Sequence, residues 1–171
     1  MPRIHVCPLS LVSETVAGSG ADRLITLINS ATPVTRPASI LPERHLFIAV
    51  NDIIEPTEGL TAPSREHVSA LLDFGRAWDR RQPLVVHCFA GISRSTAAAF
   101  ILVCALAPDR REEEIARALR AASPFATPNR LLVSVADAVL RRDGRMLAAV
   151  DGIGMGVLAE QSVPFHMSVS A

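Results

Sequence analysis

The amino-acid sequence predicts an α/β fold with a small central sheet of about four or five strands flanked by helices. Short apolar runs bounded by turn residues recur up to residue 87, as expected of buried strands. Most of the remaining chain has apolar residues at helical spacing. Because 49% of the 171 residues are hydrophobic, the chain can build one sizeable core. We therefore expect one domain over residues 1–171, with a C-terminal tail from about residue 157 to which the sequence assigns no defined structure.

The predicted strands are short and rich in aliphatic residues. A short helix is expected between the first two, ended by the turn at residues 18–20. The proline-rich segment at 32–42 is typical of a connecting loop, because proline lacks the N–H that regular structure requires. The predicted strands are residues 3–8, 23–29, 45–50 and 84–87, and the predicted short helix is residues 9–17.

Three later helices are predicted from their start signals and their apolar spacing. Ser64 is the expected N-cap of the first. Asp109 and Glu112 resemble a capping box that opens the second. Thr127 followed by Pro128 predicts an N-cap and a first-turn proline for the third. The residues expected to face inward are Val68, Leu71, Leu72, Gly75 and Trp78 in the first helix, Ile115 and Leu119 in the second, and Leu131, Leu132, Val135 and Val139 in the third.

The segment from Pro83 to Ala107 combines an apolar strand, a tight loop and a strongly apolar helix beginning near Ser95. Cys88 stands where the strand ends, and Arg94 follows six positions later with Gly91 midway. A strand, loop and helix of this kind, with one cysteine and one arginine at fixed spacing, indicates a specific site and not a chance arrangement.

A loop of this length that enters a helix can turn its backbone N–H groups inward, and the helix dipole adds positive potential. Gly91 supplies the backbone freedom that such a turn requires. The planar guanidinium of Arg94 can bind two phosphate oxygens at once, which lysine cannot do in the same geometry. The pattern therefore predicts a site for a doubly charged phosphate, in which the N–H donors belong to Phe89, Ala90, Gly91, Ile92, Ser93 and Arg94.

Cys88 is the candidate nucleophile of this site. Positive potential around a thiol favours the thiolate, which is the reactive form. The thiolate can attack phosphorus while the loop N–H groups and Arg94 stabilise the equatorial oxygens. Ser95 can then donate a hydrogen bond to the sulfur and ease its departure in a second step. The alternative is an inert buried cysteine beside a surface arginine, since cysteine is often buried.

The sequence HCFAGISRS at residues 87–95 resembles the signature loop of the cysteine-dependent protein tyrosine phosphatase superfamily. The resemblance is to its smaller, dual-specificity-like branch, including bacterial tyrosine phosphatases, and it extends over residues 48–129. It implies a single phosphatase domain that hydrolyses phosphomonoesters through a phosphocysteine intermediate. It also implies that the substrate is a phosphorylated protein or a small phosphomonoester, and that a phosphate or sulfate ion can occupy the loop.

Asp52 is the candidate general acid. The leaving oxygen of a phosphate ester departs poorly as an anion, so a nearby carboxylic acid should accelerate the reaction about 10²–10⁴-fold. Asp52 ends a predicted strand and begins a loop, and in the phosphatases that the sequence resembles the acid lies on a mobile loop at a similar distance upstream of the cysteine. The tryptophan that precedes this aspartate in the larger tyrosine-specific enzymes is Asn51 here. Glu55 and Glu58 are the alternative acids, and the remaining alternative is that Asp52 only caps a turn.

Two further residues are expected to support the loop. His87 should fix it through backbone hydrogen bonds and favour the Cys88 thiolate, the alternative being a purely structural histidine. Asn129 resembles an element that packs behind the loop in the dual-specificity branch, the alternative being an ordinary helix-start residue. Arg120 is expected at the solvent-exposed surface, the alternative being a contact with the substrate. The glycines at 152, 154 and 156 follow no strand, so they predict a frayed helix end and not a dinucleotide site.

Composition excludes several classes of partner. The net charge is zero, so no general attraction to nucleic acid or to an anionic membrane is expected. Three cysteines in no paired motif suggest neither a disulfide framework nor a zinc cluster, and the histidines lack metal-ligand spacing. We expect no cofactor. The longest apolar segment, residues 97–107, is too short to cross a bilayer, and Ser13 and Glu14 interrupt the N-terminal apolar run. The expected location is the cytoplasm.

Two other functions share part of the pattern. A rhodanese-like sulfurtransferase also places a cysteine in an anion-binding loop, but it has no role for the arginine-serine ending or for the upstream acid. A noncatalytic phosphate-recognition module would be expected to lack Cys88 or Arg94, and both are present. Among phosphatases, those acting on phosphoinositides usually carry lysines in the loop, and this loop has none. Inositol lipids are therefore disfavoured as substrates.

Overall fold

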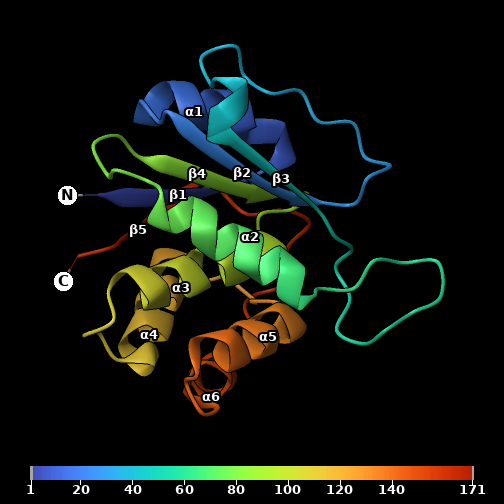
Figure 1. The fold of residues 1–171 in the computed structure, drawn as a ribbon, viewed down its shortest axis with the longest axis vertical. Coiled ribbons are helices and arrows are strands. Elements are labelled where there is room, and N and C mark those ends of the chain that lie inside the picture. The colour runs from blue at the N-terminus through green and yellow to red at the C-terminus, as the bar shows by residue number, and fades with distance from the viewer. Residues whose placement is uncertain (1, 171) are drawn as a thin grey trace.

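The computed structural model describes residues 2–170, and a five-stranded sheet lies at its centre (Figure 1). The strand order is β3-β2-β4-β1-β5. The three pairings among β1 to β4 are parallel, and β5 runs antiparallel to β1 at one edge of the sheet. The predicted α/β fold with four or five strands is confirmed. The strands are β1 (Arg3–Pro8), β2 (Arg23–Ile28), β3 (His45–Ala49), β4 (Leu84–Cys88) and β5 (Phe165–Ser168).

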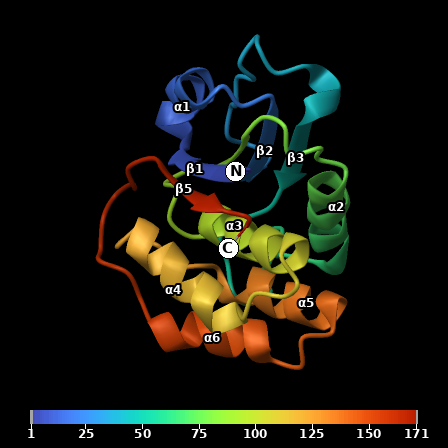
Figure 2. The same cartoon turned by 90° about the vertical axis from the view of Figure 1, so that its left-hand side faces the viewer.

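Helices cover both faces of the sheet unequally. One helix, α1 (Val12–Ser19), lies on one face, and the other five lie on the opposite face (Figures 1 and 2). Short 3₁₀ turns at Leu9–Leu11 and Pro42–Arg44 precede α1 and β3. The five remaining helices are α2 (Arg65–Arg76), α3 (Arg94–Leu106), α4 (Glu112–Ala122), α5 (Arg130–Leu140) and α6 (Arg145–Ile153).

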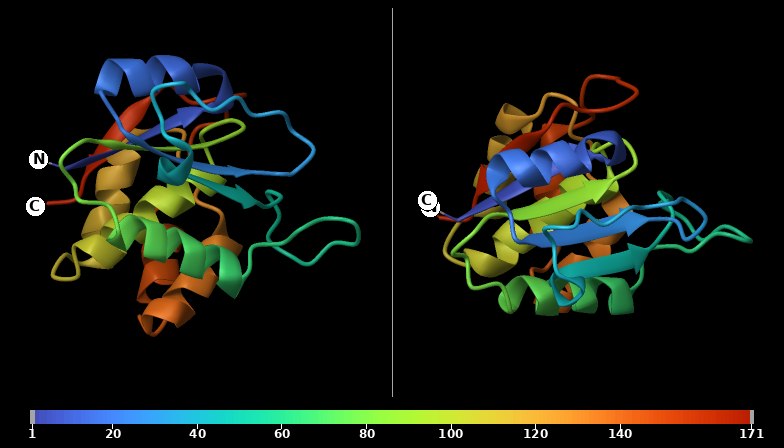
Figure 3. Two further views of the ribbon diagram at one scale, coloured as in Figure 1. Left: turned by 45° about the horizontal axis from the view of Figure 1, so that its top comes forward. Right: turned by 90° about the horizontal axis from the view of Figure 1, so that it is seen from above.

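The central strand β4 is buried along its whole length, since it pairs with β1 on one side and β2 on the other. A parallel strand covered on both faces needs apolar side chains on both, and Leu84, Val85 and Val86 provide them. Figure 3 shows β1 to β4 pointing in one direction, so the carboxyl ends of these strands lie at the same end of the sheet. Cys88 is the last residue of β4 and lies at this carboxyl end.

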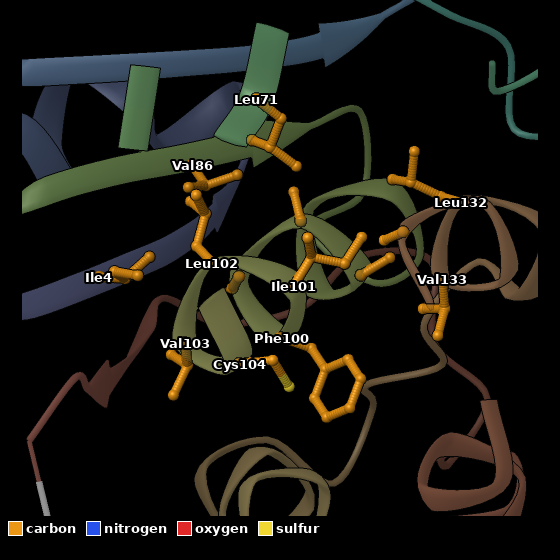
Figure 4. Packing of buried hydrophobic residues seen from close by; sticks show 14 of the residues in the cluster. Ile4, Leu71, Val86, Phe100, Ile101, Leu102, Val103, Cys104, Leu132 and Val133 are labelled. Carbon is orange, nitrogen blue, oxygen red and sulfur yellow. The ribbon is translucent and has the colours of Figure 1, made fainter. Parts of the chain in front are cut away.

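Helix α3 is the centre of the main core. Each of its residues from Arg94 to Cys104 is buried, and its aliphatic and aromatic side chains pack between the sheet and the outer helices (Figure 4). Phe100, Ile101 and Leu102 are fully buried. A helix that is apolar on all sides must be enclosed on all sides. The burial of α3 therefore holds its N-terminus, and with it Arg94, against the carboxyl end of β4.

Two predicted helix starts are corrected by the structure. α4 begins at Glu112 with Arg111 as its N-cap, and Asp109 lies in the preceding turn. The Glu112 carboxylate contacts Arg142 and Arg145 instead of closing a capping box. Three consecutive glutamates, at 112–114, occupy the first turn, where the helix dipole favours negative charge.

The start of α5 also differs from its prediction. Asn129, and not Thr127, is the N-cap, and its side-chain oxygen accepts a hydrogen bond from the Leu132 N–H at 2.9 Å. The buried face of α5 contains Leu132, Val133 and Ala136, while Leu131, Val135 and Val139, which were also expected to face inward, are only partly buried. The predicted cap of α2 is confirmed, since the Ser64 side chain accepts from the His67 N–H.

The C-terminal region contains two elements that the sequence did not predict. Helix α6 ends at Ile153 and Gly154 caps it with a positive φ of 63°, so the expected helix end at these glycines is confirmed. After an extended segment, β5 pairs with β1 in the register Ile4 opposite Met167. Strand β5 is only four residues long and alternates buried and exposed side chains, a weak signal in the sequence.

Candidate active site

The candidate nucleophile lies at the junction of β4 and the loop that enters α3. Cys88 is 2% exposed, and its Sγ is 3.1 Å from the Ser95 Oγ in the first turn of α3. Ser95 itself is fully buried. The tight loop at residues 89–93 joins the two elements, so one continuous segment brings the thiol, the hydroxyl and a helix N-terminus together.

The carbonyl groups of this loop are held from outside. The carbonyls of all loop residues except Gly91 accept hydrogen bonds from backbone N–H groups of other segments. The bonds are Leu9 N to Phe89 O (3.0 Å), Ser162 N to Ala90 O (2.8 Å), Thr127 N to Ile92 O (2.9 Å) and Asn129 N to Ser93 O (3.3 Å). Three separate parts of the chain, around Leu9, Thr127–Asn129 and Ser162, therefore fix the backbone of the loop.

The same bonds orient the loop N–H groups. In a trans peptide the C=O and the following N–H point in opposite directions, so a carbonyl held outward turns the next N–H inward. Within residues 2–170, no backbone N–H of residues 89–93 donates a hydrogen bond. Gly91 completes the turn with φ of +71°. The result is a set of unpaired N–H groups at a helix N-terminus, which is an anion-binding arrangement.

Arg94 begins α3 directly after this loop and is 6% exposed. One terminal nitrogen donates to the Val50 carbonyl at 2.9 Å, which holds the guanidinium against the end of β3. Its Nε is buried and has no hydrogen-bond partner in the part of the chain that the structure describes. A buried guanidinium N–H without a protein partner can bind an anion in the loop.

Asp52 is brought to the loop by two other residues. Its Oδ1 accepts hydrogen bonds from Ser93 Oγ at 2.7 Å and from Asn129 Nδ2 at 2.9 Å. It follows Val50, whose carbonyl binds Arg94, so the acid and the arginine are connected through the same strand end. Asp52 is also exposed, as a proton donor to substrate must be.

The alternative acids are placed differently. Glu55 and Glu58 lie farther along the loop and are exposed. Neither carboxylate forms a hydrogen bond or an ion pair to any residue from 2 to 170. Only Asp52, among the three candidates, is tied to the loop that carries Cys88. Asn129, expected behind the loop, makes this tie and also binds the Ile53 carbonyl at 3.1 Å.

His87 anchors the loop, but it carries no positive charge at neutral pH. Burial lowers its pKa to about 4. Its Nδ1 lies 3.1 Å from the Cys88 carbonyl and its Nε2 lies 2.7 Å from Thr26 Oγ1. Since only an N–H can bond to a carbonyl, Nδ1 carries the proton and Nε2 accepts from the Thr26 hydroxyl. The contact with the Cys88 carbonyl agrees with the expected backbone anchor, and any effect of His87 on the Cys88 thiolate would have to come from a neutral ring.

Other contacts were not foreseen from the sequence. Thr26 Oγ1 also lies 2.8 Å from His45 Nε2, so a chain of polar side chains leads from β3 through β2 to β4. Arg120 does not face solvent as expected. It donates to the carbonyls of Ala126, Ile153, Gly154 and Met155 and so joins α4 to the end of α6. Leu9 and Ser162 hold the loop through backbone N–H groups, so the identity of their side chains gives no sign of this contact.

The surroundings of the site are partly apolar. Phe89 of the loop is 60% exposed and Ile54, near Asp52, is 58% exposed. No helix within residues 2–170 is long and apolar enough to span a membrane. The same residues contain no group of three or more histidine, cysteine or acidic side chains arranged to hold a metal ion.

Comparison with known proteins gives matches at the level of structure. No protein-family model and no curated protein sequence matches the chain. The structure of DUSP15 superposes with a TM-score of 0.62 at 18% identity over 94% of this chain and 96% of that one. Cydia pomonella PTP-2 phosphatase gives 0.61 at 15% identity over 95% and 92%. PTPMT1 in complex with PI(5)P gives 0.58 at 15% identity over 81% and 91%. This chain therefore has the fold of the cysteine-dependent tyrosine phosphatases, in its small dual-specificity form.

Proposed function

We propose that this protein is a phosphoric monoester hydrolase of the protein-tyrosine or dual-specificity phosphatase type. The observation that carries the proposal is the arrangement around Cys88. Its sulfur lies 3.1 Å from a buried serine hydroxyl, at the start of a loop whose N–H groups have no partner within residues 2–170, and the buried Arg94 follows this loop. A nucleophile inside an anion site has a direct use in phosphoryl transfer.

The first step forms a bond between Cys88 Sγ and phosphorus. The loop N–H groups and Arg94 hold the three equatorial oxygens, whose charge they stabilise in the transition state. The bond between phosphorus and the ester oxygen breaks, and Asp52 donates its proton to that oxygen. The products of this step are the free alcohol or phenol and a phosphocysteine.

The second step hydrolyses the phosphocysteine. A water molecule attacks phosphorus, and the Asp52 carboxylate, now without its proton, accepts one from the water. The bond between sulfur and phosphorus breaks, and the leaving thiolate receives a hydrogen bond from Ser95, whose Oγ is already in contact with the sulfur. Inorganic phosphate leaves, and Cys88 and Asp52 return to their initial states.

A phosphorylated protein side chain is the substrate class that the loop favours. The side chains between Cys88 and Arg94 are uncharged, and the whole sequence lacks lysine. A phosphoinositide carries further phosphates, which require further cations beside the loop. The structure of PTPMT1 contains PI(5)P, so the fold accommodates such a ligand in that protein. For this chain we propose as substrate a protein phosphorylated on tyrosine, serine or threonine, or else a small phosphomonoester.

The position of Asp52 separates this function from sulfur transfer. A sulfurtransferase needs no proton donor for an ester oxygen, whereas here two side chains hold a carboxylate at the loop. The test is to measure hydrolysis of para-nitrophenyl phosphate and sulfur transfer from thiosulfate to cyanide, each with the Cys88→Ser protein as control. We expect the wild-type protein to hydrolyse para-nitrophenyl phosphate and the Cys88→Ser protein to show no hydrolysis. Sulfur transfer in its place, or binding of phosphate without either activity, would contradict the proposal.

A further inference from the structure

The segment between α6 and β5, residues 154–164 and here called the C-terminal strap, connects the outer helices to the edge of the sheet. Figure 2 shows it running along one side of the molecule from α6 to β5. Arg120 holds its start through the carbonyls of Gly154 at 2.9 Å and Met155 at 3.3 Å. The Val157 N–H donates to Pro124 O at 2.8 Å, and β5 fixes the end of the strap to β1. The strap is therefore anchored along its length.

One residue of the C-terminal strap contacts the loop at residues 89–93, here called the phosphate loop, directly. The Ser162 N–H donates to the Ala90 carbonyl at 2.8 Å, and Ser162 is 2% exposed. The peptide between Ala90 and Gly91 is trans, because the chain has no cis peptide bonds within its described part. With the Ala90 carbonyl held by Ser162, the Gly91 N–H points to the opposite side, into the anion site.

The contact is also tight. A Cβ added at Gly91 would lie 2.5 Å from Ser162 Oγ and 2.8 Å from the Pro8 nitrogen, so the Ser162 side chain closes the space behind Gly91. Ser162 Oγ is buried and has no hydrogen-bond partner within residues 2–170. The hydroxyl therefore contributes packing, and the backbone N–H contributes the only hydrogen bond that we find between the strap and the loop.

We propose that Ser162 is a positioning residue of the anion site, and that the C-terminal strap supports phosphate binding through this one residue. The proposal rests on the proposed function, since it concerns the same loop. Ser162 acts through Gly91, whose N–H it directs at the anion. The affinity of the site for phosphate depends on this bond, and by linkage a bound phosphate stabilises the bond in return.

The reciprocal effect is tested in the unmodified protein of residues 1–171 by amide hydrogen exchange followed by NMR, without and with inorganic phosphate. The Gly91 amide shift reports whether phosphate occupies the loop. The Arg142 amide, bonded to Asp137 O at 2.9 Å in the turn after α5, reports general stabilisation. We expect phosphate to slow exchange of the Ser162 amide by a larger factor than that of Arg142.

Two outcomes of this experiment count against different claims. If the Gly91 shift responds to phosphate but Ser162 slows no more than Arg142, Ser162 is not coupled to the anion and the inference is wrong. If the Gly91 shift does not respond at any phosphate concentration, the loop binds no phosphate, and both the proposed function and the inference fall.

Variants test the same bond by removing the donor. Ser162→Pro deletes the N–H, and Ser162→Ala keeps it while deleting the unpaired hydroxyl. We expect the inhibition constant for inorganic phosphate to rise about tenfold in Ser162→Pro, the worth of one buried hydrogen bond, and by a smaller factor in Ser162→Ala, which loses only the packing of the hydroxyl behind Gly91. Leu158→Pro is the matched control, because Leu158 is 86% exposed in the same strap. Equal weakening in both proline variants would overturn the inference.

Discussion

Asn129 Nδ2 donates to Asp52 Oδ1 at 2.9 Å, although 77 positions separate the two residues in the sequence. The same asparagine caps α5 through its Oδ1 and binds the Ser93 carbonyl through its backbone N–H. One residue therefore connects the loop that contains Asp52, the phosphate loop and the N-terminus of α5. This relationship makes the geometry of the candidate acid sensitive to a side chain outside the loop.

Replacing Asn129 should separate its two side-chain functions. Asn129→Ala removes the cap and the contact with Asp52, whereas Asn129→Ser keeps a capping oxygen but is too short to reach the carboxylate. We expect both variants to lose turnover, and only Asn129→Ala to lose about 1 kcal/mol of unfolding free energy through the cap. Denaturant unfolding and steady-state rates with phenyl phosphate measure the two effects. Full activity in Asn129→Ser would show that the contact does not position Asp52.

Asp52→Asn should lower turnover according to the leaving group. For phenyl phosphate, whose oxygen needs a proton, we expect a loss of about 10²–10⁴-fold. For an activated aryl phosphate the loss should be much smaller, because its oxygen leaves readily as an anion. Glu55→Gln is the control, since Glu55 lies on the same loop without a contact to the phosphate loop. If Glu55→Gln shows the leaving-group dependence and Asp52→Asn does not, the acid is Glu55.

Cys88→Ser should abolish turnover and leave phosphate binding largely intact. The hydroxyl is a far weaker nucleophile, but the outward-held carbonyls and inward N–H groups of the loop do not depend on the sulfur. Turnover of para-nitrophenyl phosphate and calorimetric binding of vanadate measure the two properties. Substantial turnover by this variant would exclude the covalent mechanism.

Arg94→Lys should behave as a loss of function. Lysine retains the charge, but it cannot hold the Val50 carbonyl and two phosphate oxygens with one planar group. We expect catalytic efficiency to fall by more than about tenfold, because the lost contacts act on charge that develops in the transition state. Arg130→Lys is the control, since Arg130 pairs with Asp151 at the surface. Near-normal efficiency in Arg94→Lys would contradict the assigned role.

The buried His87 should make stability depend on acid pH. Burial lowers the pKa of His87 to about 4 in the folded protein, against about 6.5 for an unfolded chain. Between these values the unfolded chain binds the proton more readily, so the contribution of His87 to stability is complete above about pH 6.5 and is lost as the pH falls through about 4.

The size of the His87 effect is on the order of 3 kcal/mol, from the difference between the two pKa values. Urea unfolding of the wild type and of His87→Asn at about pH 7 and about pH 4.5 measures it, because asparagine keeps a donor for the Cys88 carbonyl but does not titrate. We expect the wild type to lose more stability than the variant over this range. An equal loss in both proteins would show that other groups, including His5, His45 and His67, carry the pH dependence.

The sequence by itself determined the strand, loop and helix from Leu84 to Leu106 and the chemical groups within it. These groups lie in one short segment, and a loop that enters a helix N-terminus forms its anion site from its own backbone. Periodic apolar runs likewise located the first four strands and α2 to α5, because an element that buries one face has apolar residues at a regular spacing along the chain. The start of α4 and the cap of α5 were misplaced, since neighbouring polar residues compete for these positions and tertiary contacts decide between them.

Only the tertiary structure decided what surrounds that segment. The backbone N–H groups of Leu9, Thr127 and Ser162 hold the loop carbonyls. Because every residue except proline has a backbone N–H, these contacts cannot be predicted from the residue types. The His87 ring is neutral because folding buries it, a property of the packed core and not of the sequence around it. The short strand β5 and the C-terminal strap depend on pairing with β1, more than 150 residues earlier in the chain, and local periodicity carries no information about a partner at that distance.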